Sequence, residues 1–547
     1  MSEDGQTVIK PSLSGAYLAR GHARGMGDHY TAAEFLETVL AASPNDLTML
    51  RHGMIHNIDA VNYARGRMIA QRILTLDPKS PEANIHLATD AILKNEIPAA
   101  VNRIDAMSTE GVYRYSRPLL LAWLYRISGN KAAAQKALAP LQNGDIKALF
   151  TLHNGMMAEL DGNNALAETS YEATLKALPQ TPLRILHIIG SYYARHGKID
   201  RARKLYLDFT RNTADSVSGL SLLAELDAPP TQIKIPVASA KDGFTEALYN
   251  LAFLLDQNQG YELGLFFAHE ALRIKPELDV ALSLVSDMLE SNERFAQAII
   301  ALEQIKPGSP LYWNGRLRIA RAYEELGLID FAIGQLRSMS TERPERIDAL
   351  MELGGLLRQK DQFVEAAAVY DQAVSRIEKK MQPYHWALFY ARGMAYEKSN
   401  QWAKAEADFL KSLELLPDQP YVLNYLGYSW VDRNINLDRG LNMVKKAAEL
   451  RPNDGFIIDS LGWAYYRLNK YPEAVTELER AISLQPRDPT INDHLGDAYW
   501  KVGRQREARF QWERALNLDP EADQRSAIEI KLKEGISSVP KKKDNSG

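Results

Sequence analysis

Apolar residues fall into short stripes at helical spacing along the chain, and small residues recur among them at a regular interval. Three stretches share one pattern: NYLGYSWVDRNINLDRGLNMVKKAAELRP, DSLGWAYYRLNKYPEAVTELERAISLQP and DHLGDAYWKVGRQREARFQWERALNLDP. Each contains two amphipathic helix patterns separated by a turn. A two-helix unit that repeats about every 34 residues predicts a solenoid, in which no hairpin buries its apolar face alone.

Small residues at fixed positions set the register of this repeat. With the glycine of the first helix numbered 8, position 8 is small in eight consecutive units: Ala252, Ser286, Ala320, Gly354, Gly393, Gly427, Gly462 and Gly496. Position 20 is small in the same units: Gly264, Ala298, Ala332, Ala366, Ala405, Gly440, Ala474 and Ala508. A proline near position 32 closes most second helices, because proline cannot continue a helix. We therefore predict eight hairpins over 244–522.

Residues 13–214 fit the same frame more loosely. Position 8 is occupied by Arg20, Gly53, Ala88, Ala122, Gly155 and Gly190. Position 20 is occupied by Ala32, Gly66, Ala100, Ala134, Ala167 and Ala202. The pattern predicts six divergent hairpins in this first array.

Residues 215–243 separate the two arrays. The segment begins like a first helix, but APPTQIKIPVASAKDG replaces the second, and its prolines forbid a regular helix there. It is interpreted as a broken repeat. A connector packed on the surface is favoured, and a hinge or an extended segment lying in the groove are the alternatives. A second irregularity follows Ala373, where the second helix is expected to run on through SRIEKKMQPYH.

The two ends of the chain differ from the repeats. Ile528, Leu532 and Ile536 form an apolar stripe that predicts a capping helix over 523–536. Residues 1–12 and 537–547 are expected to be disordered, and the latter carry three consecutive lysines.

The repeat resembles the tetratricopeptide family, and the NYLGYSW, DSLGWAYYRL and INDHLGDAYW segments resemble secreted members from Gram-negative bacteria. The resemblance implies an all-α fold, a superhelical solenoid of about fourteen hairpins in two sub-arrays. It also implies that first helices line the concave surface and bind a protein or peptide partner.

Charge, apolar run length and cysteine content limit the partners and locations that are expected for the protein. The 547 residues carry a formal net charge of -4, which does not favour nucleic acid as a partner, and apolar runs fall short of the roughly 20 residues that span a bilayer. There are 0 cysteines, which excludes disulfides and thiolate sites and fits an oxidising compartment. The periplasm is the preferred location, as in the secreted relatives, and the cytoplasm is the alternative. The N-terminus shows no signal peptide, although a chain that begins after a removed signal has the same appearance.

The sequence offers little enzyme chemistry. No phosphate-binding loop, dinucleotide fingerprint, zinc-protease or nucleophile-elbow motif occurs. His52 and His56 could share a metal on one helix face, and Asp493, His494 and Asp497 form the other polar cluster. Packing or salt-bridged roles are favoured for both, so we expect no catalysis, metal, cofactor or small-molecule substrate.

Family positions that line the concave surface map onto the last four repeats as an aromatic groove edged with charge. The candidate partner-binding residues are Tyr390, Tyr421, Asn424, Tyr428, Phe456, Asp459, Trp463, Tyr466, Arg467, Asp493, Asp497, Trp500 and Lys501. Aromatic and arginine side chains are common anchors of protein interfaces. The leading hypothesis is a non-enzymatic scaffold, with a context in envelope assembly or maintenance suggested by the resemblance. The alternatives are an accessory subunit of a transferase or hydrolase, with Asp493, His494 and Asp497 as the acting groups, and a self-associating spacer.

Overall fold

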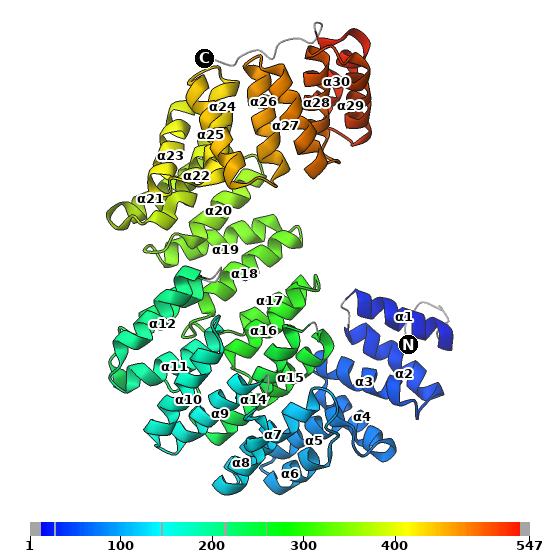
Figure 1. Ribbon diagram of the computed structural model, residues 1–547. Helices are drawn as coiled ribbons and strands as arrows, with labels where there is room; N and C mark the ends of the chain where they lie inside the picture. The colour runs from blue at the N-terminus through cyan, green and yellow to red at the C-terminus, as the bar shows by residue number, and fades with distance from the viewer. Residues whose placement is uncertain (1–11, 27–28, 144–145, 213–215, 259, 537–547) are drawn as a thin grey trace, which may run out of the picture. The chain divides into compact units, whose positions relative to one another are not determined.

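A computed structural model describes residues 12–26, 29–143, 146–212, 216–258 and 260–536. Throughout these ranges the regular structure is helical, with thirty α-helices, a few short 3-10 turns and no strand. The chain divides into two compact units, unit 1 over 1–335 and unit 2 over 336–547, which are described separately (Figure 1). The prediction of an all-α repeat fold is confirmed.

Unit 1 begins with twelve helices: α1 (Leu13–Gly25), α2 (His29–Ala42), α3 (Leu47–Asp59), α4 (Tyr63–Leu76), α5 (Pro81–Leu93), α6 (Ile97–Ala106), α7 (Tyr113–Ile127), α8 (Lys131–Leu138), α9 (Lys147–Leu160), α10 (Asn164–Ala177), α11 (Leu183–Arg195) and α12 (Ile199–Asn212). It continues with α13 (Ser216–Glu225), α14 (Ala240–Asp256), α15 (Tyr261–Ile274), α16 (Asp279–Glu290), α17 (Phe295–Glu303), α18 (Tyr312–Glu325) and the start of α19 (Ile329–Glu342).

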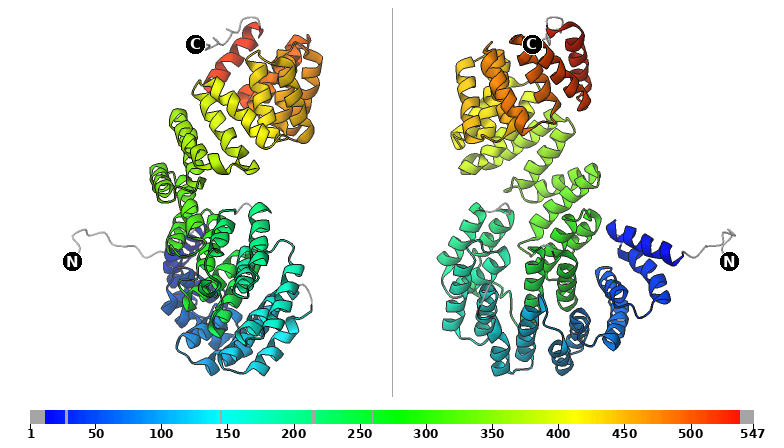
Figure 2. Two further views of the ribbon diagram at one scale, coloured as in Figure 1. Left: turned by 90° about the vertical axis from the view of Figure 1, so that its left-hand side faces the viewer. Right: turned by 45° about the vertical axis from the view of Figure 1, so that its right-hand side comes forward.

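The first twelve helices pack as six consecutive antiparallel pairs, α1 with α2 through α11 with α12 (Figures 1 and 2). Small residues at position 8 allow the two helices of a pair to approach closely. A Cβ atom added to Gly190 would lie 2.4 Å from the Tyr206 hydroxyl, and one added to Gly155 would lie 2.7 Å from the Tyr171 ring. Neither position has room for a side chain, since such contacts are shorter than atoms tolerate.

The segment between α13 and α14 packs on the first array. It contains one 3-10 turn, Pro230–Gln232, and buries Ile233 and Val237, while Ile235 is exposed. Arg195, at the end of α11, donates a hydrogen bond of 3.1 Å to the Lys234 carbonyl. The boundary between the two compact units lies elsewhere along the chain, between residues 335 and 336.

Unit 2 contains the rest of α19 and eleven further helices: α20 (Asp348–Gln359), α21 (Phe363–Ile377), α22 (Trp386–Lys398), α23 (Trp402–Leu415), α24 (Pro420–Asp432), α25 (Leu437–Leu450), α26 (Gly455–Arg467), α27 (Tyr471–Leu484), α28 (Pro489–Lys501), α29 (Gln505–Asn517) and α30 (Ala522–Glu534). Helices α20 to α29 form five hairpins, and α30 packs on α29. The two helices of a hairpin also cross closely in unit 2. A Cβ atom added to Gly496 of α28 would lie 2.5 Å from the Trp512 ring of α29.

The expected continuation of the second helix through residue 385 is wrong. Helix α21 ends at Ile377, and two 3-10 turns, Glu378–Lys380 and Pro383–His385, lead to α22. Pro383 cannot supply the backbone N–H that a continuing helix needs. The Gln382 N–H donates instead to His385 Nδ1 at 2.9 Å, which caps the new turn. The loop between α24 and α25, residues 433–436, is one residue longer than the loop between α26 and α27. Asn434 and Asn436 adopt left-handed backbone conformations there, with φ values of 57° and 47°.

No helix in the described ranges combines the length and the apolar character that crossing a bilayer would require. The predicted disordered ends lie outside the described residues, apart from Ser12.

Candidate functional site

The predicted partner-binding residues all lie on first helices of unit 2. Helix α24 packs against α26, and α26 packs against α28, so neighbouring first helices form a continuous face. The residues are Tyr390 on α22; Tyr421, Asn424 and Tyr428 on α24; Phe456, Asp459, Trp463, Tyr466 and Arg467 on α26; and Asp493, Asp497, Trp500 and Lys501 on α28. We name Tyr421, Tyr428, Phe456, Trp463 and Tyr466 the aromatic face.

Two members of the aromatic face are open to solvent. The Phe456 side chain is 55% exposed and that of Tyr421 is 42% exposed. Both sit in the first turn of their helices, which Asp454 and Gln419 cap by accepting backbone N–H hydrogen bonds. The Arg451 guanidinium lies 5.7 Å from the centre of the Tyr421 ring. Exposed aromatic rings with an adjacent arginine are typical of protein-binding surfaces.

A stack of three rings follows on α26 and α28. The Trp463 ring lies 4.6 Å from Tyr466, at an interplanar angle of 11°. It also lies 3.9 Å from the His494 ring, at 17°. His494 Nδ1 is 2.9 Å from Asp459 Oδ1. Burial acts to lower the pKa of His494, but the charge and hydrogen bond of Asp459 outweigh it and raise that pKa.

This stack fixes the indole in place without burying it completely. The imidazole and indole planes are nearly parallel, so the two rings pack face to face. Trp463 is therefore a preorganised surface, with little side-chain freedom to lose when a partner binds. Sequence reasoning placed Trp463 and Tyr466 on this face but assigned no stacking role to His494.

Tyr390, Asn424 and Tyr428 are half-buried. The Tyr390 ring packs 6.0 Å from Phe409 and 5.9 Å from Tyr425. The side-chain oxygen of Asn424 is buried and accepts no hydrogen bond from the described residues. Burial raises the pKa of Tyr428, and the nearby carboxylates of α24 and α26 add to the effect. Tyr390 and Asn424 therefore support the aromatic face from below, and Tyr428 is a half-buried member of it.

Charged residues at the edge of the face divide into exposed and buried groups. Arg467 is exposed and pairs with Asp432 at 2.5 Å, and Lys501 is exposed at the end of α28. Asp459 is 8% exposed, and it is engaged by His494 as described above.

Asp493 and Asp497 face the last helix of the chain. They are 7% and 5% exposed, and Lys531 of α30 donates hydrogen bonds to them at 2.7 and 2.8 Å. Trp512 Nε1 donates a further bond of 3.0 Å to Asp497. Burial, and then the charge of Asp493, raises the pKa of Asp497 to about 6. The two carboxylates are thus internal charge partners of a lysine that sequence reasoning did not single out.

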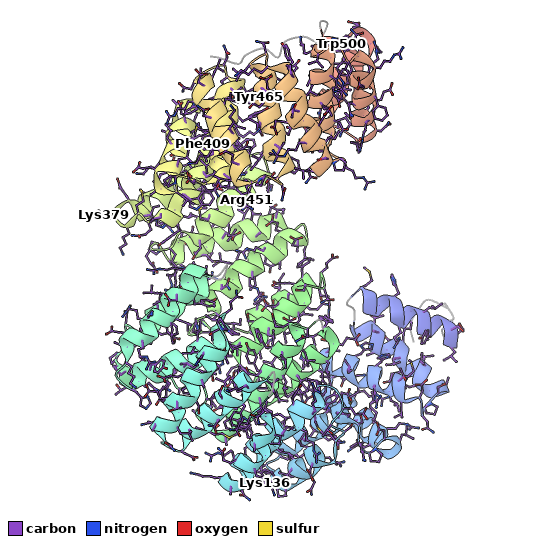
Figure 3. All side chains as sticks on the ribbon, in the orientation of Figure 1. Lys136, Lys379, Phe409, Arg451, Tyr465 and Trp500 are labelled. Atoms are coloured by element: carbon purple, nitrogen blue, oxygen red, sulfur yellow. The ribbon has the colours of Figure 1, made fainter. Side chains whose placement is uncertain are left out.

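Trp500 also contacts the end of the chain. Its ring lies 5.4 Å from that of Trp512, and a Cβ on Gly535 would lie 2.5 Å from it. Gly535 has φ 82°, a left-handed conformation that suits glycine. Trp500 therefore joins α30 to the last hairpin (Figure 3).

The candidate metal pair lies in unit 1. The rings of His52 and His56 stack at 6.2 Å, and an Arg20 nitrogen lies 3.1 Å from His52 Nδ1. Over the residues that the structure describes, no group of three or more His, Asp or Glu side chains is placed to hold a metal ion.

The tetratricopeptide repeat family matches residues 317–384 and 386–419, and its TPR repeat description matches 462–503. A TPR repeat-containing protein of Pseudomonas aeruginosa is 28% identical over 198 residues, which are 36% of this chain and 32% of that protein. RNA polymerase-associated protein CTR9 of Caenorhabditis elegans is 23% identical over 438 residues, 72% of this chain and 36% of that protein.

The chain spans about a third of the length of these two curated relatives. A crystal structure of the APC/C hetero-tetramer Cut9–Hcn1 contains a chain with a TM-score of 0.39 and 16% identity, covering 96% of each chain. The family matches fall on residues that form α18 to α23 and α26 to α28. The chain therefore carries tetratricopeptide repeats over these residues.

Proposed function

We propose that the protein is a non-enzymatic interaction scaffold that holds a protein or peptide partner on the aromatic face of unit 2. The observation that carries the proposal is the pair of exposed rings, Tyr421 and Phe456, beside the fixed Trp463 stack. Burying two large exposed rings against a partner gives a large apolar gain. The repeat family and its interaction role support the same conclusion.

The rival role in hydrolysis is not favoured by the geometry. Asp493 and Asp497 already share the Lys531 ammonium group, and His494 is held between Asp459 and Trp463. A general acid or base must reach a substrate proton, and these groups are directed at one another.

We also propose a periplasmic location and a context in envelope assembly or maintenance, with the cytoplasm as the alternative. The 0 cysteines and the resemblance to secreted bacterial members of the family support this location.

The test compares partner capture by three forms of the full chain. The first is the wild type and the second carries Tyr421→Ala and Phe456→Ala. The third carries Phe510→Ala, which removes a ring that is 61% exposed on α29, a second helix outside the aromatic face. Proteins retained from native extract are quantified by mass spectrometry, after circular dichroism has shown equal folding.

We expect the wild type and the Phe510 variant to retain one or more proteins in similar amounts. The double variant should retain at least about tenfold less of these proteins. Equal retention by all three forms would show that the aromatic face is not the binding surface. A reaction catalysed by the purified wild-type chain and abolished by Asp497→Asn, with capture unchanged, would favour the enzyme alternative.

A further inference from the structure

A hairpin of the second array, α14–α15, lies against first helices of the first array within unit 1. Helix α14 contacts α7 and α9, and α15 contacts α3 and α5 (Figure 1). A solenoid is expected to make contacts mainly between sequence neighbours. Here the segments in contact are at least 80 residues apart, and all four partner helices are first helices of their pairs.

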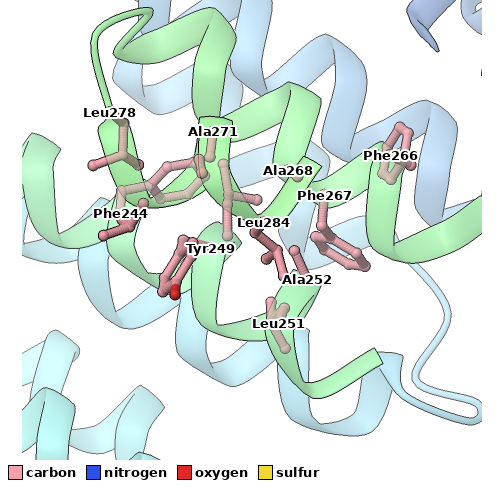
Figure 4. Close-up of a cluster of buried hydrophobic side chains, with 14 of the residues drawn as sticks. Phe244, Tyr249, Leu251, Ala252, Phe266, Phe267, Ala268, Ala271, Leu278 and Leu284 are labelled. Atoms are coloured by element: carbon pink, nitrogen blue, oxygen red, sulfur yellow. The ribbon is translucent and has the colours of Figure 1, made fainter. Parts of the chain in front are cut away.

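Apolar packing provides one part of this contact. Trp123 of α7 is fully buried, and a Cβ added to Gly243 of α14 would lie 2.1 Å from its ring. Trp123 Nε1 donates a hydrogen bond of 2.9 Å to His153 Nδ1 on α9, which fixes the indole. Phe244 and Phe267 belong to the buried cluster that α14 and α15 share (Figure 4). The indole therefore meets bare backbone, which only a glycine at 243 permits.

A buried ion pair joins α11 to α14. Arg184 and Glu246 have side chains 6% and 1% exposed, and Arg184 Nη2 lies 2.7 Å from Glu246 Oε2. The Arg184 Nε–H also donates to the same carboxylate at 3.1 Å, so the contact is bidentate. Burial acts to lower the pKa of Arg184, but the Glu246 charge and hydrogen bond raise it overall. Removing either partner would leave an unpaired charge in a dry environment.

A second charged cluster joins α5 to α15. His86 Nδ1 lies 2.6 Å from Glu270 Oε1, and both side chains are fully buried. Arg273 donates to Glu270 at 2.8 Å and also pairs with Asp90 of α5. Burial acts to raise the pKa of Glu270, but His86 and Arg273 lower it overall. A third point lies at the end of α3, where Asp59 is 3.3 Å from His269.

Buried polar contacts of this kind contribute more to the specificity of a contact than to its strength. Replacing a buried ion pair with apolar residues is often neutral, whereas a mismatched charge is costly. Residues on α3, α5, α7 and α11 each meet a different residue of α14 or α15. We name Asp59, His86, Asp90, Trp123 and Arg184 the first-array face. Such a set of matched contacts is what a specific binding surface requires.

We propose that the first-array face is a docking surface for a helical hairpin of defined charge pattern, and that its occupant is α14–α15 of the same chain. This docking, and not the covalent connector, holds the first array and the second array together within unit 1. The first six repeats thus bind an internal ligand, whereas the aromatic face serves outside partners. The inference does not depend on the function proposed for unit 2.

The test cuts the connector of the full chain. A protease site is inserted between Pro229 and Pro230, both of which are exposed, and the folded protein is cleaved to completion. Light scattering after size exclusion then measures the mass. We expect one species with the mass of the uncleaved chain, at micromolar concentration and in 0.5 M salt.

Charge reversal identifies the contact responsible. Arg184→Glu or Glu246→Arg alone should weaken association of the cleaved halves roughly 100-fold, since each places like charges in a buried site. The two together should restore it to within about tenfold. Arg203→Glu is the matched control, because Arg203 is 43% exposed and its pair with Asp227 spans 3.9 Å.

Dissociation of the cleaved wild type into two halves would overturn the proposal. So would equal association of the single reversals and the control, or a double reversal no better than the singles. A mass twice that of the chain would show docking between copies and would overturn the assignment to the same chain. If a single reversal prevents folding before cleavage, recovery of the folded mass in the double reversal is the supporting result.

Discussion

Lys531 donates a hydrogen bond of 2.7 Å to Asp493, which joins the last helix of the chain to the first helix of the last hairpin. The two residues are 38 positions apart and both are less than 10% exposed. Of the described residues on α30, only Ile528 and Lys531 are fully buried, so this contact provides much of the attachment of the helix.

Replacing Lys531 with methionine is expected to destabilise the end of unit 2 by about 3–5 kcal/mol, because Asp493 and Asp497 would remain buried without their cation. Hydrogen exchange of α28–α30 amides measures the loss. Lys533→Met is the control, since Lys533 is exposed on the same helix. If the two variants exchange alike, the lysine does not hold the helix.

Stability in this region should also depend on pH through Asp497. Its pKa is raised to about 6, first by burial and then by Asp493, so the folded state binds the proton more tightly than the unfolded chain. The stability contributed by this group is fully present below pH 4 and is lost as the pH rises through about 6. A shift of two pKa units corresponds to at most about 3 kcal/mol.

Asp497→Asn should remove this pH dependence, and the amide oxygen can still accept the Trp512 hydrogen bond. Exchange free energies of α28 and α29, measured at pH 4.5 and 7.5, test the prediction in both forms. An unchanged difference between the two pH values in the variant would assign the dependence to other groups.

Two adjacent glycines on α20 should respond to alanine in opposite directions. A Cβ on Gly354 would lie 2.4 Å from the Tyr370 ring, whereas nothing lies within 4 Å of one on Gly355. Gly354→Ala should lower the free energy of unfolding by about 1–3 kcal/mol through overpacking. Gly355→Ala should raise it by about 0.5–1 kcal/mol through reduced chain entropy. Urea unfolding distinguishes the signs, and a stabilising Gly354→Ala would refute the close crossing.

Gly243→Ala should disturb both arrays of unit 1, because the added methyl would collide with Trp123. We expect hydrogen exchange to accelerate on α7 and α9 as well as on α14. Gly308→Ala is the control, since its Cβ would meet nothing within 4 Å. Acceleration confined to α14 would indicate that the two arrays do not depend on each other.

The repeated part of the fold could be predicted from the sequence because its signals are local and recur. Gly354, Gly393 and Gly496 are small for one reason, since Tyr370, Phe409 and Trp512 cross at those points. A single small residue does not identify a repeat, but eight small residues at the same position of consecutive units do. The prediction for the turn before α22 is wrong because the insertion there occurs in only one unit. No other unit shows which backbone conformation such an insertion adopts.

Contacts between distant segments left no comparable signal. Arg184 and Glu246 are 62 positions apart, and His86 and Glu270 are 184 apart. Each pair occurs once, and in sequence each residue resembles an ordinary surface charge. The same applies to the candidate site. The family positions identified the helices that carry Phe456 and Trp463, but the burial of Asp493 and Asp497 depends on Lys531, which lies outside the repeat.

The contact of α14–α15 with the first array also bears on how the gene can change. Repeat proteins commonly gain or lose whole units by duplication, because each unit meets only its neighbours. Within unit 1, an added or deleted hairpin would shift Arg184 relative to Glu246 and His86 relative to Glu270. We therefore expect homologues to keep the number of hairpins between α3 and α15 constant, and to vary the number that follows α19.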